Sequence, residues 1–395
     1  MSTQKGMLPQ TSVRSLSQIL HKCIEEKKKN ELFDVFRLYS YMKRDGLANL
    51  ASVRSLVGLM LLSIPNGQKV FDEFVHNNEY GSCFDSLIID LIKAQELRHA
   101  LMLYERIGMH SLHLNDYTFV SLLKVCADLQ DEEKGHHIHG VVNTSGCLQR
   151  NIFIGNALVN MYAKCGAIHK VRDIFYEMPF RDVVSWTTVI AGLIDYKYYF
   201  EALDCFEKMQ FEGILPNVAT MACLLKACGN IGAIDKGQKL HASLYAKELA
   251  QKNVMVGNAL VDMYGKCGFL SKASELFDEM LVRDVISWTT LIAGYVTHEH
   301  GNKAVNCFDQ MQLEGVSPNV ATFACTLKAC GITGAKDKGR EIHEMIIKEF
   351  LHKDIVIGNA LMDMYAKCGL LTKSHSMFES FVVRDVVAWT VVIAS

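Results

Sequence analysis

The sequence lacks long apolar runs, a net charge of either sign and paired cysteine motifs, and each absence excludes a class of protein. No run of 18 uncharged apolar residues occurs, so no membrane-spanning helix is predicted. The 41 Lys and Arg residues balance 43 Asp and Glu residues, for a formal net charge of −2, which argues against a generally basic nucleic-acid binder. Half of the residues are hydrophobic, which excludes disorder throughout. A chain of 395 residues would ordinarily fold as two or three domains.

The 13 cysteines do not form a zinc or disulfide pattern, because no Cys-x-x-Cys motif occurs and their number is odd. Six of them recur in register with a repeated sequence: Cys126, Cys165, Cys228, Cys267, Cys330 and Cys368. We therefore expect small buried thiols in a reducing compartment.

A repeat of about 100 residues dominates the sequence. The segments NIFIGNALVNMYAKCGAI, NVMVGNALVDMYGKCGFL and DIVIGNALMDMYAKCGLL begin at Asn151, Asn253 and Asp354. The segments RDVVSWTTVIAGL, RDVISWTTLIAGY and RDVVAWTVVIAS recur at the same spacing. Each long period contains three shorter repeats, of 35, 36 and 31 residues, except that the middle repeat at 320–354 has 35 residues.

Each short repeat is predicted to be a pair of helices. In residues 254–284, apolar side chains twice follow the i, i+3, i+4 spacing of one helix face. The first set is Val256, Ala259, Leu260, Met263 and Tyr264, and the second is Ala273, Leu276, Phe277 and Met280. Residues 265–268 (Gly-Lys-Cys-Gly) interrupt the pattern between them. Neither helix can bury its apolar face alone, so we expect an all-α, right-handed solenoid of about ten stacked helix-turn-helix repeats.

The repeat VVSWTTVIAG…EALDCFEKMQFEGILPN resembles a pentatricopeptide repeat, and the 35/36/31 order resembles the P, L and S triplets of the plant-type (PLS) subclass. The tetratricopeptide repeat is the nearest alternative, but its constant period of about 34 residues does not fit. The resemblance divides the chain into an N-terminal segment (1–14), two degenerate repeats (15–80), repeats at 81–115, 116–151, 152–182, 183–217, 218–253, 254–284, 285–319, 320–354 and 355–385, and a first helix alone (386–395).

The resemblance implies recognition of single-stranded RNA, with one base per repeat. In this family the fifth and last residues of a repeat contact the base edge, and the second residue packs against the base ring. The base-reading residues would be Asn156 with Asp182, Asn258 with Asp284 and Asn359 with Asp385 in S-type repeats, and Thr187 with Asn217 and Thr289 with Asn319 in P-type repeats. The base-sandwiching residues would be Phe153, Val184, Met255, Ile286, Val356 and Val387.

In the family, Asn with Asp favours uridine and Thr with Asn favours adenosine, so the expected core is 5′-UANUANU-3′. The unassigned positions belong to the L-type repeats, whose fifth residues Ala222 and Ala324 cannot hydrogen-bond a base. The base also stays open for Asp85 with Asn115, and for the repeat with Val120 as its fifth residue. An alternative interpretation is that the recurring Asp and Asn residues are duplicated helix caps. Helix propensity, however, gives no reason for Asn or Thr at the fifth position.

Three lysines recur at the thirteenth residue of the S-type repeats: Lys164, Lys266 and Lys367. The resemblance implies that they can meet RNA phosphates. The alternative is that they complement the negative end of the helix dipole. In the L-type repeats, Lys124, Lys226 and Lys328 leave both interpretations open.

No catalytic or metal motif is found. The deaminase domain that edits RNA needs His-x-Glu and Pro-Cys-x-x-Cys, and neither string occurs, nor does a Walker A or Gly-x-Ser-x-Gly motif. His136, His137 and His139 are clustered, but His139, His241 and His343 occupy one repeat position, which favours packing over metal binding. We therefore expect a non-enzymatic protein without cofactor, membrane or small-molecule substrate.

The resemblance implies a site-recognition factor for organellar C-to-U RNA editing, with a deaminase-domain protein or editing cofactor acting in trans. An RNA stability or processing factor and a protein-interaction scaffold are the alternatives. The first 24 residues contain no acidic residue but include Lys5, Arg14 and Lys22, which weakly resembles a transit peptide to the mitochondrion or chloroplast. Because residues 386–395 supply only a first helix, we expect a further segment or a partner to cover it.

Overall fold

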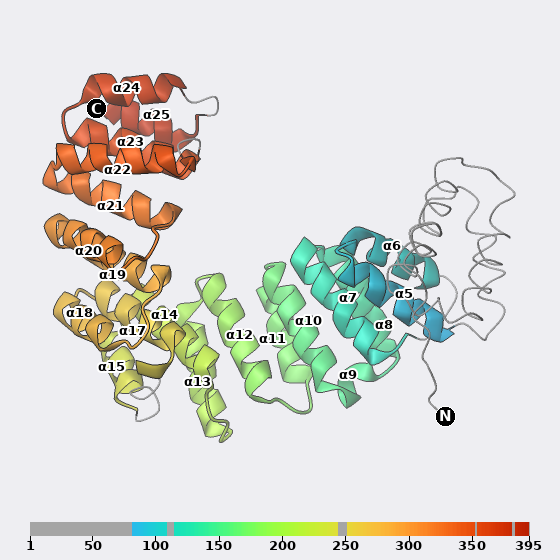
Figure 1. The fold of residues 1–395 in the computed structure, drawn as a ribbon. Helices are drawn as coiled ribbons and strands as arrows, with labels where there is room; N and C mark the ends of the chain where they lie inside the picture. Colours follow the sequence, from blue (N-terminus) through green and yellow to red (C-terminus); the bar gives the residue numbers. More distant parts are fainter. Residues whose placement is uncertain (1–80, 109–113, 244–250, 352–353, 381–383, 395) are drawn as a thin grey trace, which may run out of the picture. The chain divides into compact units, whose positions relative to one another are not determined.

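The computed structural model describes residues 81–394, except for 109–113, 244–250, 352–353 and 381–383. The predicted N-terminal segment and the two degenerate repeats therefore lie outside the described residues. All elements of the described residues are helices, without any strand (Figure 1). The chain divides into two compact bodies, residues 1–192 and 193–395, and each is described by itself.

The first body contains a series of helix pairs. Its helices are α5 (Gly81–Lys93), α6 (Leu97–Gly108), α7 (Asp116–Leu129), α8 (Glu132–Thr144), the short α9 (Cys147–Arg150), α10 (Ile152–Lys164), α11 (Ile168–Glu177) and most of α12 (Val183–Asp195). Helix α10 packs on α7, the first helix of the preceding repeat, and on α11, the second helix of its own repeat.

The second body repeats the same arrangement. Its helices are α13 (Tyr199–Phe211), α14 (Val218–Ile231), α15 (Ile234–Ala242), α17 (Val254–Lys266), α18 (Leu270–Glu279), α19 (Val285–Thr297), α20 (Gly301–Leu313), α21 (Val320–Thr333), α22 (Lys336–Lys348), α23 (Ile355–Lys367), α24 (Leu371–Ser380) and α25 (Val386–Ala394). The first helices α14, α17, α19, α21, α23 and α25 pack side by side in chain order, and α17, α19, α21 and α23 each pack on their own second helix. This stacking confirms the predicted all-α solenoid.

The last residue of a repeat is the N-cap of the next repeat's first helix. Asn217, Asp284 and Asn319 each form a capping box with the residue three positions later, which satisfies amides that the first turn leaves unpaired. Asn253 and Asp354 accept hydrogen bonds from the first-turn amides of α17 and α23. The S-type first helices end before glycines with positive φ, for example Gly268 at 83°, a conformation that glycine adopts at low cost.

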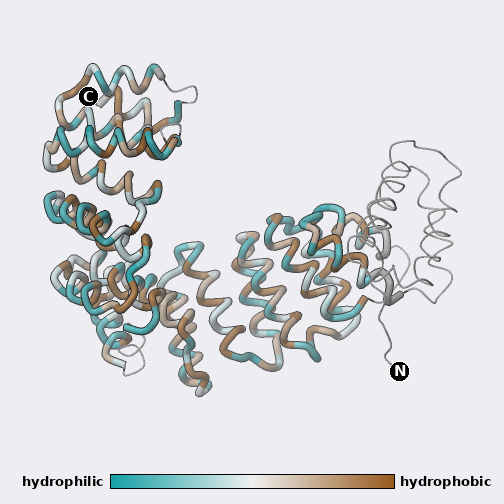
Figure 2. The backbone as a smooth tube through the Cα atoms, in the orientation of Figure 1, coloured by the Kyte–Doolittle hydropathy of each residue, from teal (hydrophilic) through white to brown (hydrophobic). Residues whose placement is uncertain are grey.

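The core follows the predicted apolar faces, with two differences. Hydrophobic residues recur along the helices in Figure 2, and of the two predicted sets in residues 254–284 only Ala259 is not buried. The helix also continues through Gly265 and Lys266, where the sequence pattern predicted the interruption to start. A Cβ atom at Gly265 would lie 3.5 Å from the Cα atom of Gly294 in α19. This is an ordinary van der Waals distance, and Gly265 lies inside the helix without ending it.

Candidate functional site

The fifth and last residues of the S-type repeats are brought together, although 26 residues separate them. Asn156 lies in the second turn of α10, and its Nδ2 atom is 3.4 Å from the Oδ1 atom of Asp182 at the start of α12. Asn258 and Asp284 have the same separation of 3.4 Å. Each pair lies where the first helix of one repeat meets the N-terminus of the next, because first helices stack directly on each other.

The third S-type pair has a closer geometry. The Nδ2 atom of Asn359 lies 3.1 Å from Oδ1 and 2.9 Å from Oδ2 of Asp385. In this pair one amide nitrogen therefore contacts both oxygens of the carboxylate.

All three aspartates accept a hydrogen bond from the backbone amide three positions later, and two of them also accept one from a serine hydroxyl. Asp182 Oδ1 accepts hydrogen bonds from the backbone amide of Ser185 at 2.8 Å and from its hydroxyl at 2.9 Å. Asp284 and Ser287 have the same two distances. Partial burial raises the pKa of both carboxyls, but these hydrogen bonds and that of the asparagine outweigh burial and hold the pKa below its usual value. Both carboxylates are therefore ionised at neutral pH.

The amide oxygens of Asn156 and Asn258 are buried, and they accept no hydrogen bond from the described residues. A buried polar atom without a partner costs about 1–3 kcal/mol. The amide oxygen of Asn359 is not a buried atom without a partner. In the first two predicted S-type pairs the asparagine oxygen thus has no partner among the described residues, and it is itself buried.

The predicted P-type pair in the second body, Thr289 with Asn319, is linked through Thr322. Thr289 Oγ1 lies 2.6 Å from Thr322 Oγ1, and the Thr322 hydroxyl donates to Asn319 Oδ1 at 2.9 Å. Thr289 also donates to the carbonyl of Val285 in its own helix at 2.7 Å. Thr187 in α12 makes the equivalent bond to Val183 at 2.6 Å, and Asn217 caps α14.

The six predicted sandwiching residues are all exposed, although they are apolar. Their exposed fractions run from 48% to 69%, for Phe153, Val184, Met255, Ile286, Val356 and Val387. Each lies in the first turn of a first helix, one turn before the reading residue of its own repeat. An apolar surface of this kind is suited to stacking against a flat ring.

Two features of the repeats before residue 152 were not predicted from the sequence. Tyr117, the second residue of its repeat, is 65% exposed and thus matches the sandwiching residues in position and exposure. Asp85 Oδ1 accepts hydrogen bonds from the backbone amide of Asn115 at 3.1 Å and from the hydroxyl of Thr118 at 2.6 Å. The position of Tyr117 in its repeat was the signal that could have found it.

The three candidate phosphate lysines are each held by a carboxylate. Lys164 pairs with Asp128 of the preceding first helix at 2.8 Å. Lys266 and Lys367 pair with the aspartate four residues earlier in their own helices, each at 2.7 Å. A phosphate would have to compete with these carboxylates. Lys226 pairs with Asp195 at 3.5 Å, whereas Lys124 and Lys328 form no ion pair within the described part of the chain.

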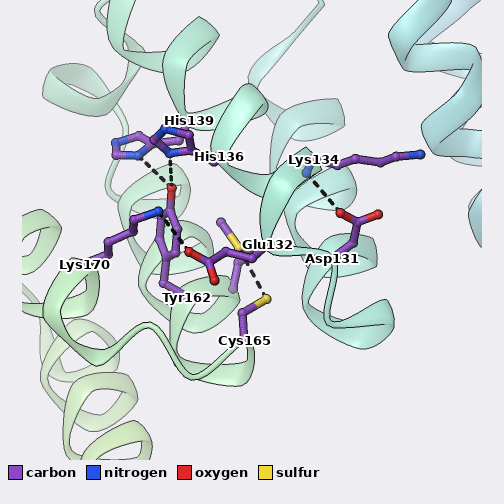
Figure 3. Close-up of polar contacts among 9 residues, drawn as sticks. Asp131, Glu132, Lys134, His136, His139, Tyr162, Cys165 and Lys170 are labelled. Carbon is purple, nitrogen blue, oxygen red and sulfur yellow. Dashed lines mark hydrogen bonds and ion pairs between the residues drawn. The ribbon is translucent and has the colours of Figure 1, made fainter.

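Two histidines of the cluster in the first body contact one tyrosine (Figure 3). The Nδ1 atoms of His136 and His139 each lie 3.1 Å from the hydroxyl of Tyr162. The ammonium group of Lys170 lies over the ring of the same tyrosine, 5.0 Å from its centre. Burial, the neighbouring His136 and Lys170 lower the pKa of His139, which favours its neutral form.

The histidine-to-tyrosine hydrogen bond recurs in the second body. His241 contacts Tyr264 at 3.0 Å, and His343 contacts Tyr365 at 2.8 Å. These bonds join the second helix of an L-type repeat to the first helix of the following S-type repeat. Across the residues that the structure describes, no group of three His, Cys, Asp or Glu side chains is arranged to hold a metal ion.

The buried thiols are poorly suited to nucleophilic chemistry. Burial is the main reason that the pKa of Cys126 and of Cys330 is raised to about 12, and that of Cys228 to about 11. A thiolate is therefore scarce at neutral pH. None of the helices in the described part of the chain has both the length and the apolar character needed to cross a bilayer.

Comparisons with known proteins match the repeats. The PPR repeat family model matches residues 181–230 and 283–331, and the PPR repeat model matches 156–183, 258–285 and 359–386. The first model covers the repeats with the Thr–Asn pairs, and the second covers the repeats with the Asn–Asp pairs.

The relatives are plant proteins. Pentatricopeptide repeat-containing protein At4g38010 of Arabidopsis thaliana is 34% identical over 78% of this chain and 54% of its own length. The chloroplastic protein At1g11290 of the same plant is 31% identical over 95% of this chain and 46% of its own length. The chain thus spans about half the length of the curated relatives it matches.

Solved structures share the fold. The crystal structure of the pentatricopeptide repeat protein PPR10 in complex with an 18-nucleotide psaJ RNA element has a TM-score of 0.60, with 14% identity, over 92% of this chain and 59% of that chain. Together, the matched repeats, the relatives and the stacked helix pairs identify the chain as a pentatricopeptide repeat protein.

Proposed function

We propose that the chain binds single-stranded RNA in a sequence-specific manner, with one base for each P- or S-type repeat. The observation that carries the proposal is the recurrent pairing of a fifth-residue amide with a last-residue carboxylate beside an exposed apolar second residue. An amide can meet the edge of an unstacked base while the apolar side chain packs on its ring. PPR10, which shares this fold, was solved in complex with an 18-nucleotide RNA element, and this supports the same ligand class.

The proposed base readers are Asn156 with Asp182, Thr187 with Asn217, Asn258 with Asp284, Thr289 with Asn319, and Asn359 with Asp385. Their order along the chain corresponds to 5′-UANUANU-3′. The proposed phosphate contacts are made by Lys164, Lys266 and Lys367 after they exchange a carboxylate for a phosphate oxygen. An exposed ion pair is worth at most about 1 kcal/mol, so this exchange costs little.

We further propose that this recognition serves C-to-U editing of organellar RNA, with the deaminase supplied in trans or by another part of a longer protein. The 35/36/31 order of repeats supports this role, since it resembles the PLS arrangement of editing factors. Relatives named as chloroplastic or mitochondrial support an organellar location.

The test is a gel-shift titration with an RNA that contains UANUANU and with one in which every U and A of the core is exchanged. We expect the first RNA to bind about tenfold more tightly or better, because several hydrogen bonds of about 0.5–1.5 kcal/mol are lost in the second. Equal affinity for the two RNAs would exclude the proposed code.

A substitution in one repeat sharpens the test. Asn258→Thr combined with Asp284→Asn gives repeat 254–284 the Thr–Asn pair of repeat 285–319. We expect the preference at the fourth nucleotide of the core to move from uridine to adenosine, with the other positions unchanged. A preference that stays with uridine would show that these two residues do not read the base.

A further inference from the structure

Five buried hydroxyl side chains occupy one position, the third residue of a repeat. They are Thr118, Ser185, Thr220, Ser287 and Thr322, and each is 0% exposed. In every case the preceding repeat has a polar fifth residue: Asp85, Asn156, Thr187, Asn258 and Thr289. A buried hydroxyl at the third residue thus follows a repeat whose fifth residue is polar.

The third residue is apolar where the fifth residue of the preceding repeat is apolar. After Val120, Ala222 and Ala324, the third residues of the next repeats are Ile154, Val256 and Ile357. These three side chains are also 0% exposed. Burial alone therefore does not require a hydroxyl at this position, since a branched aliphatic side chain fills it equally well.

Hydrogen bonds join the hydroxyl to the reading residues of the preceding repeat. The Ser287 hydroxyl donates to Asp284 Oδ1 at 2.9 Å. The Thr322 hydroxyl contacts both Thr289 and Asn319, at 2.6 Å and 2.9 Å. In the first body, Thr118 contacts the fifth and last residues of repeat 81–115 in the same manner, at 2.6 Å and 3.0 Å.

One repeat provides an internal comparison, because Ala388 replaces the hydroxyl after repeat 355–385. There Asn359 contacts both carboxylate oxygens of Asp385, at 3.1 Å and 2.9 Å. Where Ser287 is present, Asn258 makes one contact of 3.4 Å with Asp284. The serine hydroxyl thus donates to an aspartate oxygen that the asparagine amide contacts more closely where the serine is absent.

We propose that the third residue of the following repeat is a positioning residue for base recognition. Its hydroxyl bonds to an oxygen of the last-residue side chain, so that the fifth residue keeps more of its hydrogen-bonding groups for the base. This inference rests on the proposed RNA function. It means that repeat 254–284 discriminates its base more sharply than repeat 355–385, although both carry Asn with Asp.

The test is a pair of reciprocal variants, Ser287→Ala and Ala388→Ser. The readout is the ratio of affinities for RNAs with uridine or adenosine at one position, the fourth nucleotide for the first variant and the seventh for the second. We expect Ser287→Ala to lower the ratio by about threefold to tenfold, the loss of one effective hydrogen bond. Ala388→Ser should raise it by a similar factor, and Ser287→Thr should retain it because Thr322 serves the same position.

A matched control is Ser374→Ala. Ser374 is 0% exposed and donates to the carbonyl of Met362 at 3.1 Å, remote in sequence from every reading pair but Asn359 with Asp385. Its substitution should leave the ratio at the fourth nucleotide unchanged, whereas a general loss of stability would lower the affinity for both RNAs alike.

The outcomes separate this inference from the proposed function. An unchanged ratio in Ser287→Ala and Ala388→Ser, while Asn258→Thr with Asp284→Asn still moves the preference, overturns the positioning role alone. An unchanged preference in all of these variants overturns base reading as well. If Ser287→Ala does not fold, Ala388→Ser decides, since an unaltered ratio in that variant contradicts the inference.

Discussion

Neutralising two carboxylates, through Asp262→Asn together with Asp363→Asn, is expected to tighten RNA binding. Each carboxylate lies 2.7 Å from the ammonium group of the lysine four residues later, Lys266 or Lys367. These are the lysines proposed to meet phosphate. Asn160 occupies the same position in the first S-type repeat, so the substitution introduces a side chain that this fold already accepts.

The magnitude follows from the strength of the ion pairs. An i, i+4 pair on a helix surface contributes about 0.3–0.5 kcal/mol, so two pairs oppose phosphate binding by about 0.6–1.0 kcal/mol. Their removal corresponds to an affinity gain of about threefold to fivefold. The gain should shrink as the salt concentration rises, because exposed charges are then screened.

The assay is a fluorescence-anisotropy titration of the UANUANU RNA at several salt concentrations, alongside the control Glu275→Gln with Asp309→Asn. The control carboxylates lie on second helices and pair with Lys272 at 2.6 Å and with Lys338 at 2.7 Å. Both double variants raise the formal net charge from −2 to zero. An equal gain in both would mean that only net charge matters, and no gain in either would mean that the two lysines do not reach the RNA backbone.

Three further predictions concern stacking, packing and pH. Phe153→Ala should weaken RNA binding by about 1–3 kcal/mol but hardly change the urea midpoint, since the ring is 69% exposed; a large drop in the midpoint would indicate a structural role instead. Trp288→Ala should lose about 3–5 kcal/mol of unfolding free energy. Trp288→Phe should lose much less, because the buried indole Nε1–H has no hydrogen-bond partner among the described residues. Equal losses in the two variants would contradict this reasoning. Folding lowers the pKa of Asp182 and Asp284 below 3.8 despite partial burial, so their contribution to stability is present above that value and is lost as the pH falls through the lowered pKa. Unfolding free energies measured across acidic pH should therefore fall less steeply in Asp182→Asn with Asp284→Asn than in the unaltered protein.

The repeat pattern was sufficient to predict the helix pairs and most of the core. A capping residue acts on amides two or three positions away, and an apolar face needs only the helical period. The face of residues 254–266 that contains Leu260, Met263 and Tyr264 is therefore buried as predicted. The sequence pattern was wrong at Gly265, because one glycine lowers helix propensity by only about 1 kcal/mol, and helix α17 continues through it to Lys266, before Gly268 with its positive φ.

The candidate site was predicted only in part, because its geometry depends on contacts between helices of different repeats. The family resemblance supplied Asn258 and Asp284 as a pair, but the separation of their atoms depends on how two first helices stack. The exposure of Tyr117 also depends on stacking. Contacts between residues about 26 to 36 positions apart are not encoded in any local period.

The sequence by itself determined the order and length of the repeats, the start of each first helix and the residue types available for reading a base. These properties depend on neighbours within a few positions along the chain. The tertiary structure decided which side chains meet between repeats, which apolar residues stay exposed and which lysines are already paired with carboxylates. Those outcomes depend on the stacking of helices from different repeats, which leaves the exposed apolar side chains and the Asn–Asp pairs together at the N-terminal turns of the first helices.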